Sequence, residues 1–258
     1  GVLLDINRFY EPRRDLVVTV TVSSATSTLA RYDYVNDRLG LRITRKDIIG
    51  GRLVRTNVFG YNGRSELTNA AMGTDRFRYQ YDTIGNRQVA VDNDMTNLYQ
   101  ANVLNQYTSI LPAGANPAYD ADGNMTSNGV FTYVWDAENR LTEVWSNDTT
   151  IVRNAYDFMG RRVRKSTTTA TNTFLYDGWN LLREDVGAAT PSSRCYVWGL
   201  DLSGTLQGAG GVGGLLAILS PGSGLLTPVC DANGNVTHLV DTNGSIAARY
   251  EYDPFGNF

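Results

Sequence analysis

A four-residue motif, Asp-x-x-Gly, recurs along this chain and constrains its fold more than any other feature. Asp at the first position and Gly at the fourth suit a type I turn, so the chain reverses direction at each copy. In several copies Asn replaces the Gly, and Asn also tolerates a positive φ. Twelve copies or close variants begin at Asp37, Asn62, Asp82, Asn102, Asp120, Asp136, Asp157, Asp177, Asp201, Asp231, Asp241 and Asp253.

The copies between Asp37 and Asp177 follow one another at intervals of about twenty residues, a period typical of repeat proteins. Tyr79 and Tyr81 precede one turn and place both rings on the same face of a strand. Apolar and polar residues alternate again from Arg87 to Val91, which indicates an outgoing strand. Each repeat is therefore predicted to be a β-hairpin.

Paired aromatic residues stand at a fixed distance before most turns. We expect them to form ladders across the sheet, stabilised by ring contacts between neighbouring strands. The pairs are Tyr32 and Tyr34, Phe59 and Tyr61, Tyr79 and Tyr81, Tyr133 and Trp135, Phe174 and Tyr176, Tyr196 and Trp198, and Tyr250 and Tyr252.

The charged residues exclude one class of function and suggest a structural role for arginine. A net charge of −3 argues against a nucleic-acid-binding surface. Of the 23 basic residues only Lys46 and Lys165 are lysines. Because guanidinium groups stack on tyrosine and pair with carboxylates or main-chain carbonyls, the arginines are predicted to stabilise the ladders; solubilising surface charge is the alternative.

The spacing of the turns divides the chain into three parts. Residues 1–203 form the hairpin array, residues 204–224 a glycine-rich apolar insert, and residues 225–258 a second set of repeats. Within the insert we expect Gly208–Leu219 to be a loop or short helical turn that covers the sheet. The longest apolar stretch, Val212–Leu219, is too short to span a bilayer.

Three features together resemble the RHS or YD-repeat family: the tandem Tyr-x-Tyr-Asp-x-x-Gly units, the run from Tyr196 to Leu215, and Tyr250–Gly256. The resemblance covers nearly the whole chain. It implies an all-β fold in which tandem hairpins form a curved, spiralling antiparallel sheet that is part of a shell or barrel. It also implies a secreted or cell-surface bacterial protein that encloses a variable C-terminal toxin.

The family's self-cleavage region carries Asp-Pro-x-Gly pairs, and this sequence has the repeat-like Asp253-Pro254-Phe255-Gly256. We expect the chain to be a fragment of a longer polypeptide that ends before that core region. The implied partner is the remainder of the parent polypeptide, including its toxin.

Gly208-x-Gly210-x-x-Gly213 matches a dinucleotide-binding fingerprint by letter. That fingerprint needs a preceding strand and a full helix after it, and Ser220-Pro221-Gly222 interrupts the apolar residues that follow. We interpret these glycines as a structural loop and predict no cofactor.

Two further patterns resemble a calcium site and a nucleophilic dyad, but a structural role explains each of them more simply. The turns at Asp120, Asp231 and Asp241 resemble the start of a calcium loop but lack its closing Glu and its glycine spacing, so Asx-turns explain them. His238, the only histidine, and Cys230 could form a nucleophilic dyad, yet no third group is evident, and a partly exposed histidine on a strand is the simpler interpretation. Cys195 and Cys230 form one disulfide or none.

The sequence therefore predicts a non-enzymatic shell or scaffold segment with no catalytic, metal or cofactor site. Self-association is expected through terminal strands at Leu16–Val22 or Ala247–Tyr252, because unpaired strand edges invite pairing. A hydrolase that depends on His238 is one alternative. The other is a carbohydrate-binding or adhesive surface module, in which glycans stack on Trp135, Trp145, Trp179 and Trp198.

Overall fold

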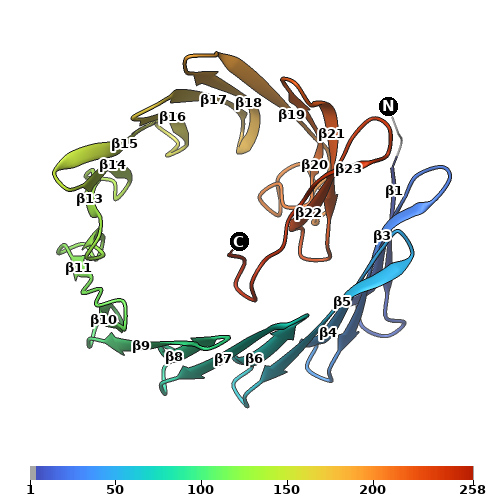
Figure 1. Cartoon of the computed structure of the whole chain (residues 1–258), viewed down its shortest axis with the longest axis horizontal. Helices are drawn as coiled ribbons and strands as arrows, with labels where there is room; N and C mark the ends of the chain where they lie inside the picture. Colours follow the sequence, from blue (N-terminus) through green and yellow to red (C-terminus); the bar gives the residue numbers. More distant parts are fainter. Residues whose placement is uncertain (1–3, 258) are drawn as a thin grey trace. The chain divides into compact units, whose positions relative to one another are not determined.

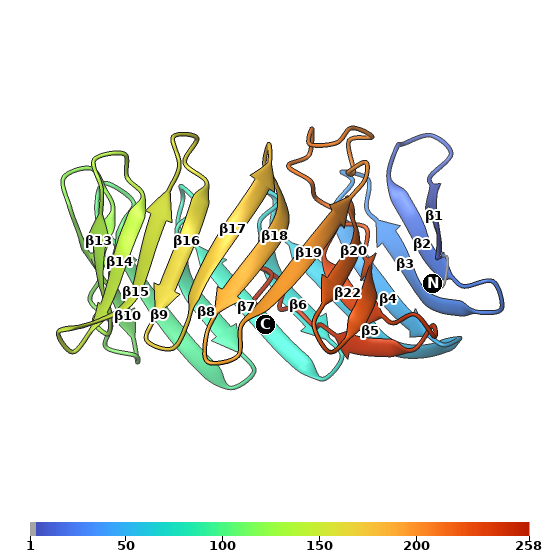
Figure 2. The ribbon, with the colours of Figure 1, turned by 90° about the horizontal axis from the view of Figure 1, so that it is seen from above.

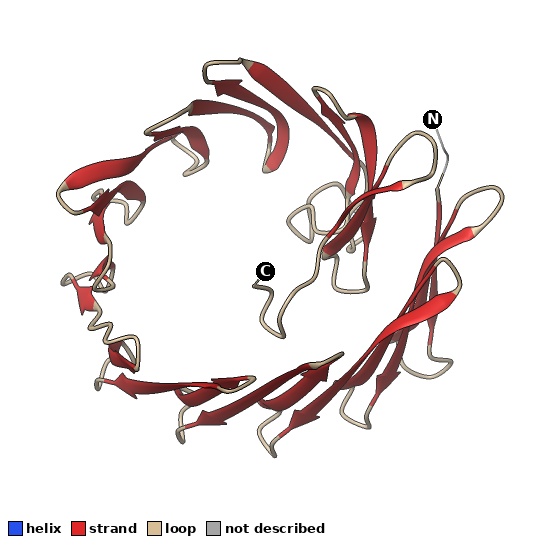
Figure 3. Cartoon of the chain, viewed as in Figure 1, coloured by secondary structure: helices blue, strands red, loops and turns tan. Residues whose placement is uncertain are grey.

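The computed structural model describes residues 4–257, in which strands alternate with short turns and no residue is helical (Figure 3). The prediction of an all-β chain of tandem hairpins is confirmed. Among these residues there is accordingly no helix with the length and apolarity needed to cross a membrane.

Within each sheet the strands pair in chain order, so neighbouring strands have neighbouring colours in Figures 1 and 2. One sheet runs from β1 to β10 and a second from β11 to β23. The strands are β1 (Asp5–Tyr10), β2 (Val17–Ser23), β3 (Thr28–Asn36), β4 (Arg42–Ile49), β5 (Arg52–Tyr61), β6 (Leu67–Met72), β7 (Asp75–Tyr81), β8 (Arg87–Asp92), β9 (Met95–Ala101), β10 (Tyr107–Leu111), β11 (Ala118–Tyr119), β12 (Met125–Ser127), β13 (Thr132–Trp135), β14 (Leu141–Ser146), β15 (Thr149–Tyr156), β16 (Arg162–Thr167), β17 (Thr171–Asp177), β18 (Asn180–Gly187), β19 (Ser192–Trp198), β20 (Leu215–Ser220), β21 (Gly224–Cys230), β22 (Val236–Val240) and β23 (Ile246–Arg249).

The chain forms two compact units. Unit 1 comprises the chain up to residue 80, residues 90–95 and residues 198–258; unit 2 comprises residues 81–89 and 96–197. Unit 1 thus combines the first strands of the chain with the last four. Unit 2 is a series of hairpins, interrupted by residues 90–95.

Eleven of the twelve predicted turns share one main-chain geometry. In the turn at Asp82, the N–H of Gly85 donates to the Asp82 carbonyl and the N–H of Asp82 donates to the Asn86 carbonyl. The carboxylate oxygen Oδ1 of Asp82 accepts from the N–H groups of Ile84 and Asn86 at 3.0 and 2.8 Å. The first side chain of the motif therefore fixes the main chain of its own turn.

The fourth position of these turns requires a positive φ, as the sequence predicted. Gly85 has φ 96°, and Ser65, Asn105 and Asn139 adopt 64°, 62° and 59° at the equivalent position. Only the marker at Asp177 was wrong: Asp177 pairs directly with Asn180 across a two-residue hairpin.

Hydrogen bonds between repeats tie the aromatic ladders together. The tyrosine just before a turn donates its hydroxyl to the carbonyl of the fifth residue after an earlier marker, and Trp135 does the same with its indole N–H. That marker is the preceding one in every case except Tyr252, which reaches back past Asp241 to the turn at Asp231. The bonds are Tyr61 to Arg42 (2.9 Å), Tyr119 to Tyr107 (3.1 Å), Trp135 to Met125 (2.8 Å), Tyr156 to Leu141 (2.7 Å), Tyr176 to Arg162 (3.0 Å) and Tyr252 to Val236 (2.7 Å).

The arginines support these ties, which confirms the structural role predicted for them. Arg140 pairs with Asp136 of its own turn at 2.8 Å and lies 5.3 Å over the ring of Tyr156 in the next repeat. Arg161 repeats the arrangement with Asp157 and Tyr176. One guanidinium thus joins two consecutive repeats.

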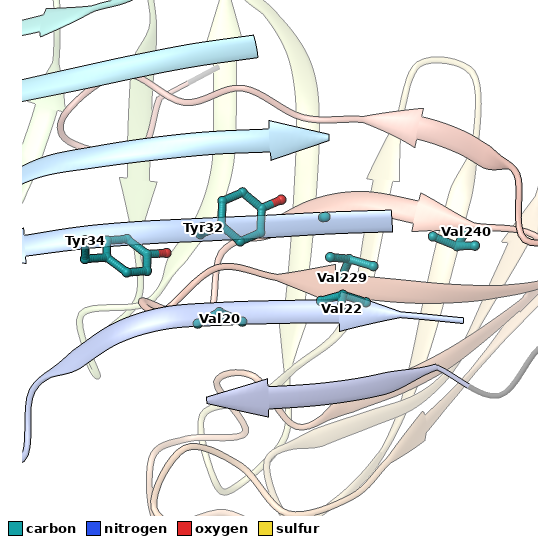
Figure 4. Packing of buried hydrophobic residues seen from close by; sticks show 7 residues of the cluster. Val20, Val22, Tyr32, Tyr34, Val229 and Val240 are labelled. Carbon is teal, nitrogen blue, oxygen red and sulfur yellow. The ribbon is translucent and has the colours of Figure 1, made fainter. Parts of the chain in front are cut away.

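The hydrophobic core of unit 1 lies between β2 and β3 on one side and β21 and β22 on the other (Figure 4). Val20 and Val22 have no exposed surface, and Val229 and Val240 are 1% exposed. Burial of several such side chains, each worth about 1.5–3 kcal/mol, holds the last strands against the first.

Two sequence predictions are corrected. Leu16–Val22 was expected at a free edge, but β2 pairs with β1 on one side and β3 on the other. Within Gly208–Leu219, Leu215–Leu219 is part of strand β20, which pairs with β21. The residues of β20 form an unbroken apolar run without the polar and apolar alternation typical of a strand. Such a run does not distinguish a strand from other buried segments.

Replacing Asn102 by Ala tests the turn geometry. Its Oδ1 accepts from the N–H groups of Leu104 and Gln106 at 2.9 and 3.0 Å, so the substitution should lower the free energy of unfolding by about 1 kcal/mol in urea titration. Val103→Ala is the matched control, since Val103 in the same turn is 98% exposed and should change nothing measurable. Equal effects of the two substitutions would contradict the role assigned to Asn102.

Candidate functional site

A polar pocket of about 300 Å³ lies within unit 1. Its walls come from β3, β4 and β5, from the residues around β22, and from the segment Arg249–Gly256. The lining side chains include Tyr32, Arg42, Arg45, Asp47, Arg55, Asn57, Phe59, His238, Arg249, Glu251 and Phe255.

Arg45 links the pocket wall to the turn after β21. Its guanidinium donates at 2.7 Å to Asp47 on the same strand and at 2.7 Å to Asp231. Asp231 has no exposed surface and also accepts from the N–H groups of Asn233 and Asn235. Burial lowers the pKa of Arg45, but the two carboxylates outweigh it and raise that pKa above its ordinary value. Arg45 is therefore charged and bridges the two carboxylate side chains.

His238 is held by a chain of hydroxyl groups. Thr237 Oγ1 donates to the Val229 carbonyl at 3.0 Å, so the Tyr32 hydroxyl donates to Thr237 at 2.6 Å. His238 Nδ1 lies 3.2 Å from both hydroxyl oxygens, whose protons are thus already used, and must donate its own. The neutral ring then carries its lone pair on Nε2.

Burial, aided by Arg249 and Arg45, lowers the pKa of His238 to about 4, against a weaker opposing effect of Glu251. His238 is therefore neutral at pH 7. It is 4% exposed, which corrects the expectation of a partly exposed histidine. Among the described residues, Nε2 of His238 has no hydrogen-bond partner.

Asn57, in the middle of β5, is the second side chain with unused polar atoms. It is 1% exposed, and residues 4–257 offer no hydrogen-bond partner to either its Oδ1 or its Nδ2. Asn57 pairs in register with Arg45 on β4 and Met72 on β6, and all three line the pocket. No sequence pattern pointed to Asn57, because a single Asn inside a strand is neither a turn signal nor a known ligand motif.

The segment after β23 lies along the pocket. The N–H of Tyr250 donates to the Thr237 carbonyl at 2.8 Å, and Glu251 accepts from Arg55 at 3.1 Å. The ring of Phe255 meets Tyr79 edge-on at 4.9 Å between centroids. Glu251 is half exposed, so the pocket opens to solvent beside it.

The structure brings Cys230 and His238 onto adjacent strands but does not join them chemically. His238 Nδ1 bonds to Tyr32 and Thr237, and His238 is in register with Val229. Burial, with Asp231 adding to it, raises the pKa of Cys230 to about 11, which keeps the thiol protonated and a poor nucleophile. Cys195 and Cys230 are both free thiols.

The glycine loop binds a carboxylate of its own chain. Asp201 Oδ2 accepts from the N–H groups of Ala209 and Gly211 at 2.7 and 3.1 Å, while Oδ1 accepts from Ser203. The Ser203 hydroxyl contributes most to lowering the pKa of Asp201 to about 2; burial opposes the shift, and the main-chain N–H groups add to it. A phosphate cradle would need these same donors.

The remaining sequence candidates have structural contacts. Asp120 and Asp241 accept N–H groups of their own turns, and the described residues contain no group of three His, Cys, Asp or Glu side chains that could hold a metal ion. Of the four tryptophans proposed as glycan platforms, Trp135 and Trp145 donate their indole N–H to Met125 and Glu143. Trp179 is 57% exposed.

Consecutive hairpins with recurrent Asx-turns, tied to one another by tyrosine or tryptophan side chains, define a YD-repeat protein of the shell type. The Photorhabdus luminescens Tc holotoxin pore has the same fold: TM-score 0.78 and 16% identity over 98% of this chain and 14% of that one. A TcdB2-TccC3-Cdc42 crystal structure matches with TM-score 0.76 and 16% identity, over 98% of this chain and 15% of that one.

The chain belongs to the Teneurin YD-shell family, whose model matches residues 20–188. Curated relatives include the tRNA nuclease WapA of Bacillus subtilis strain 168, 32% identical over 128 residues, and the tRNA3(Ser)-specific nuclease WapA of Bacillus spizizenii, 33% identical over the same length. Each match covers 47% of this chain and 5% of the relative.

Arg45→Leu tests the buried ion pairs. It leaves Asp47 and Asp231 without their shared cation, and should cost about 3–5 kcal/mol of unfolding free energy in urea titration. Arg31→Leu on β3 is the control: Arg31 pairs with Asp33 two residues along its strand, as Arg45 does with Asp47, but is half exposed. It should cost less than about 1 kcal/mol. Similar losses in both variants would refute the distinction.

His238 should make stability depend on pH. Its pKa is about 4 in the folded protein and 6.5 without the surrounding structure. Between these values the unfolded chain binds more protons, so stability is full above pH 6.5 and falls as the pH drops to 4, by up to about 3 kcal/mol.

The measurement is the free energy of unfolding of wild type and His238→Gln from pH 7 to pH 4. The other groups facing His238, namely Tyr32, Arg45, Arg249 and Glu251, are common to both proteins, so the difference reports on the histidine. Parallel curves would show that His238 does not titrate in this way.

Proposed function

We propose that this chain is a non-enzymatic segment of a protein shell that encloses or presents a C-terminal effector of its parent polypeptide. The observation that supports this most directly is the YD-shell fold, which extends over 98% of the chain in its likeness to the Tc holotoxin pore. In such a fold the tandem hairpins serve as a wall, and the contacts between repeats are its structural elements.

The names of the relatives fit a toxin context. The WapA proteins are named tRNA nucleases and the solved structures belong to Tc toxin assemblies, but this chain matches only 5% of the former and about 14% of the latter. We therefore place any toxic activity in another part of the parent polypeptide, and the present chain acts as its container. Secretion or display at the cell surface, as in a toxin, is part of the proposal.

Protease protection in the full-length parent polypeptide tests this role. The segment that follows the repeats should resist proteinase K, and Gly160→Val should make it sensitive, because Gly160 has φ 78° in a turn where valine is strained. Gly63→Ala is the control, since no atom approaches a Cβ at that position. Digestion of that segment as fast as the same segment expressed alone would overturn the proposal.

A further inference from the structure

The pocket of unit 1 carries a set of unused hydrogen-bonding groups that the shell does not need. Most buried polar groups in proteins are paired, and each one that is not costs about 1–3 kcal/mol. Here four buried polar atoms have no partner among the described residues: Asn57 Oδ1, Asn57 Nδ2, His238 Nε2 and Arg42 Nε. All three side chains line the same pocket.

We propose that this pocket binds a small, uncharged polyhydroxy compound of the size of a monosaccharide. The first argument is the balance of donors and acceptors. Asn57 Nδ2 and Arg42 Nε donate; Asn57 Oδ1 and the bare Nε2 of His238 accept. A hydroxyl group both donates and accepts, so neighbouring hydroxyls on one ring can satisfy the whole set.

The charges around the pocket argue against an ionic ligand. Arg45 contacts Asp47 and Asp231, whereas Glu251 accepts from both Arg55 and Arg249. Arg42 and Asp253 also line the pocket, so four arginines face four carboxylates and the formal charges cancel. A carboxylate or phosphate would also place acceptor oxygens against the lone pair of His238. An ammonium group would have no use for the donors of Asn57 and Arg42. Only an uncharged polyhydroxy ligand can form hydrogen bonds with all four unpaired atoms.

The size and the apolar part of the wall fit the same ligand. A volume of about 300 Å³ is at the lower end of ligand pockets, which excludes an oligosaccharide but accommodates one sugar ring. Phe59, Tyr250, Tyr252 and Phe255 line the pocket beside the polar groups and offer apolar ring surface to the C–H groups of a sugar. Entry is beside the half-exposed Glu251.

Asn57→Leu separates binding from folding. Leucine has the branched shape of asparagine and no polar atoms, and the pocket beside position 57 leaves room for its greater volume. The substitution therefore removes two buried unpaired groups and should raise the urea midpoint of the ligand-free protein. The same substitution should weaken ligand binding about tenfold or more, the loss expected when two hydrogen bonds disappear. A residue that merely supports the fold would show the opposite effect on stability.

The probes are D-glucose, D-galactose and N-acetyl-D-glucosamine, tested on the 258-residue chain by calorimetry and ligand-observed NMR at millimolar concentration. Glucose 6-phosphate and glucosamine carry the same ring with a charge and should bind at least about tenfold more weakly. Trp179→Ala, at an exposed tryptophan of unit 2, is the control and should bind like wild type.

Three outcomes would overturn the proposal. If no neutral sugar binds, Asn57 and His238 belong to an internal polar cavity without a ligand of this class. If binding persists in Asn57→Leu or is lost in Trp179→Ala, the sugar occupies a surface site. If the phosphate binds as well as the neutral sugars, the charge argument is wrong.

Discussion

The fold depends on one local constraint, the capture of main-chain N–H groups by the first side chain of each turn. Because Oδ1 of Asp or Asn accepts from the residues two and four positions later, the reversal is specified within five residues and needs no tertiary support. The positive φ at the fourth position then admits Gly, Asn or, at position 65, Ser. The tyrosine ties and the arginine links between repeats both involve residues next to or within such a turn.

The tyrosine tie converts local turns into a continuous array. A turn alone determines one hairpin, whereas Tyr156 reaches back 15 residues to the Leu141 carbonyl and so fixes where the next hairpin lies. Arg140 adds a second link between the same repeats through Asp136 and Tyr156. Trp135 stands in the place of a tyrosine and makes the same bond, so the tie needs a donor on an aromatic ring and not one particular residue.

The two central positions of the turn make no such contact. Apolar residues such as Val103 and Phe158 are tolerated there although they are 98% and 92% exposed.

Sequence reasoning succeeded where the determinants are local and periodic. The turns, the hairpins and the role of arginine follow from residues a few positions apart, and the one wrong turn, Asp177, failed because a two-residue hairpin uses the same letters. The strand at Leu215–Ser220 and the interior position of Val17–Ser23 were missed because neither a uniform apolar run nor a strand's alternation reveals its neighbours. The family resemblance provided the shell fold.

The pocket lay beyond prediction for a different reason. It forms where residues about 200 positions apart meet, as Tyr32 meets Thr237 and His238, and Arg45 meets Asp231. Unit 1 differs from a plain hairpin array in that β21 and β22 pack on β2 and β3. One face becomes an apolar core, and the polar residues beside it, such as Arg45 and Asp231, are buried as ion pairs.

This packing also changes the hydrogen-bonding requirement of single residues. An asparagine on an open strand is hydrated and costs nothing, whereas the same side chain at position 57, closed in by the packing of the last strands, retains its full need for partners. The packing that stabilises the unit is thus also what creates the unused hydrogen-bonding groups from which a ligand site can be inferred.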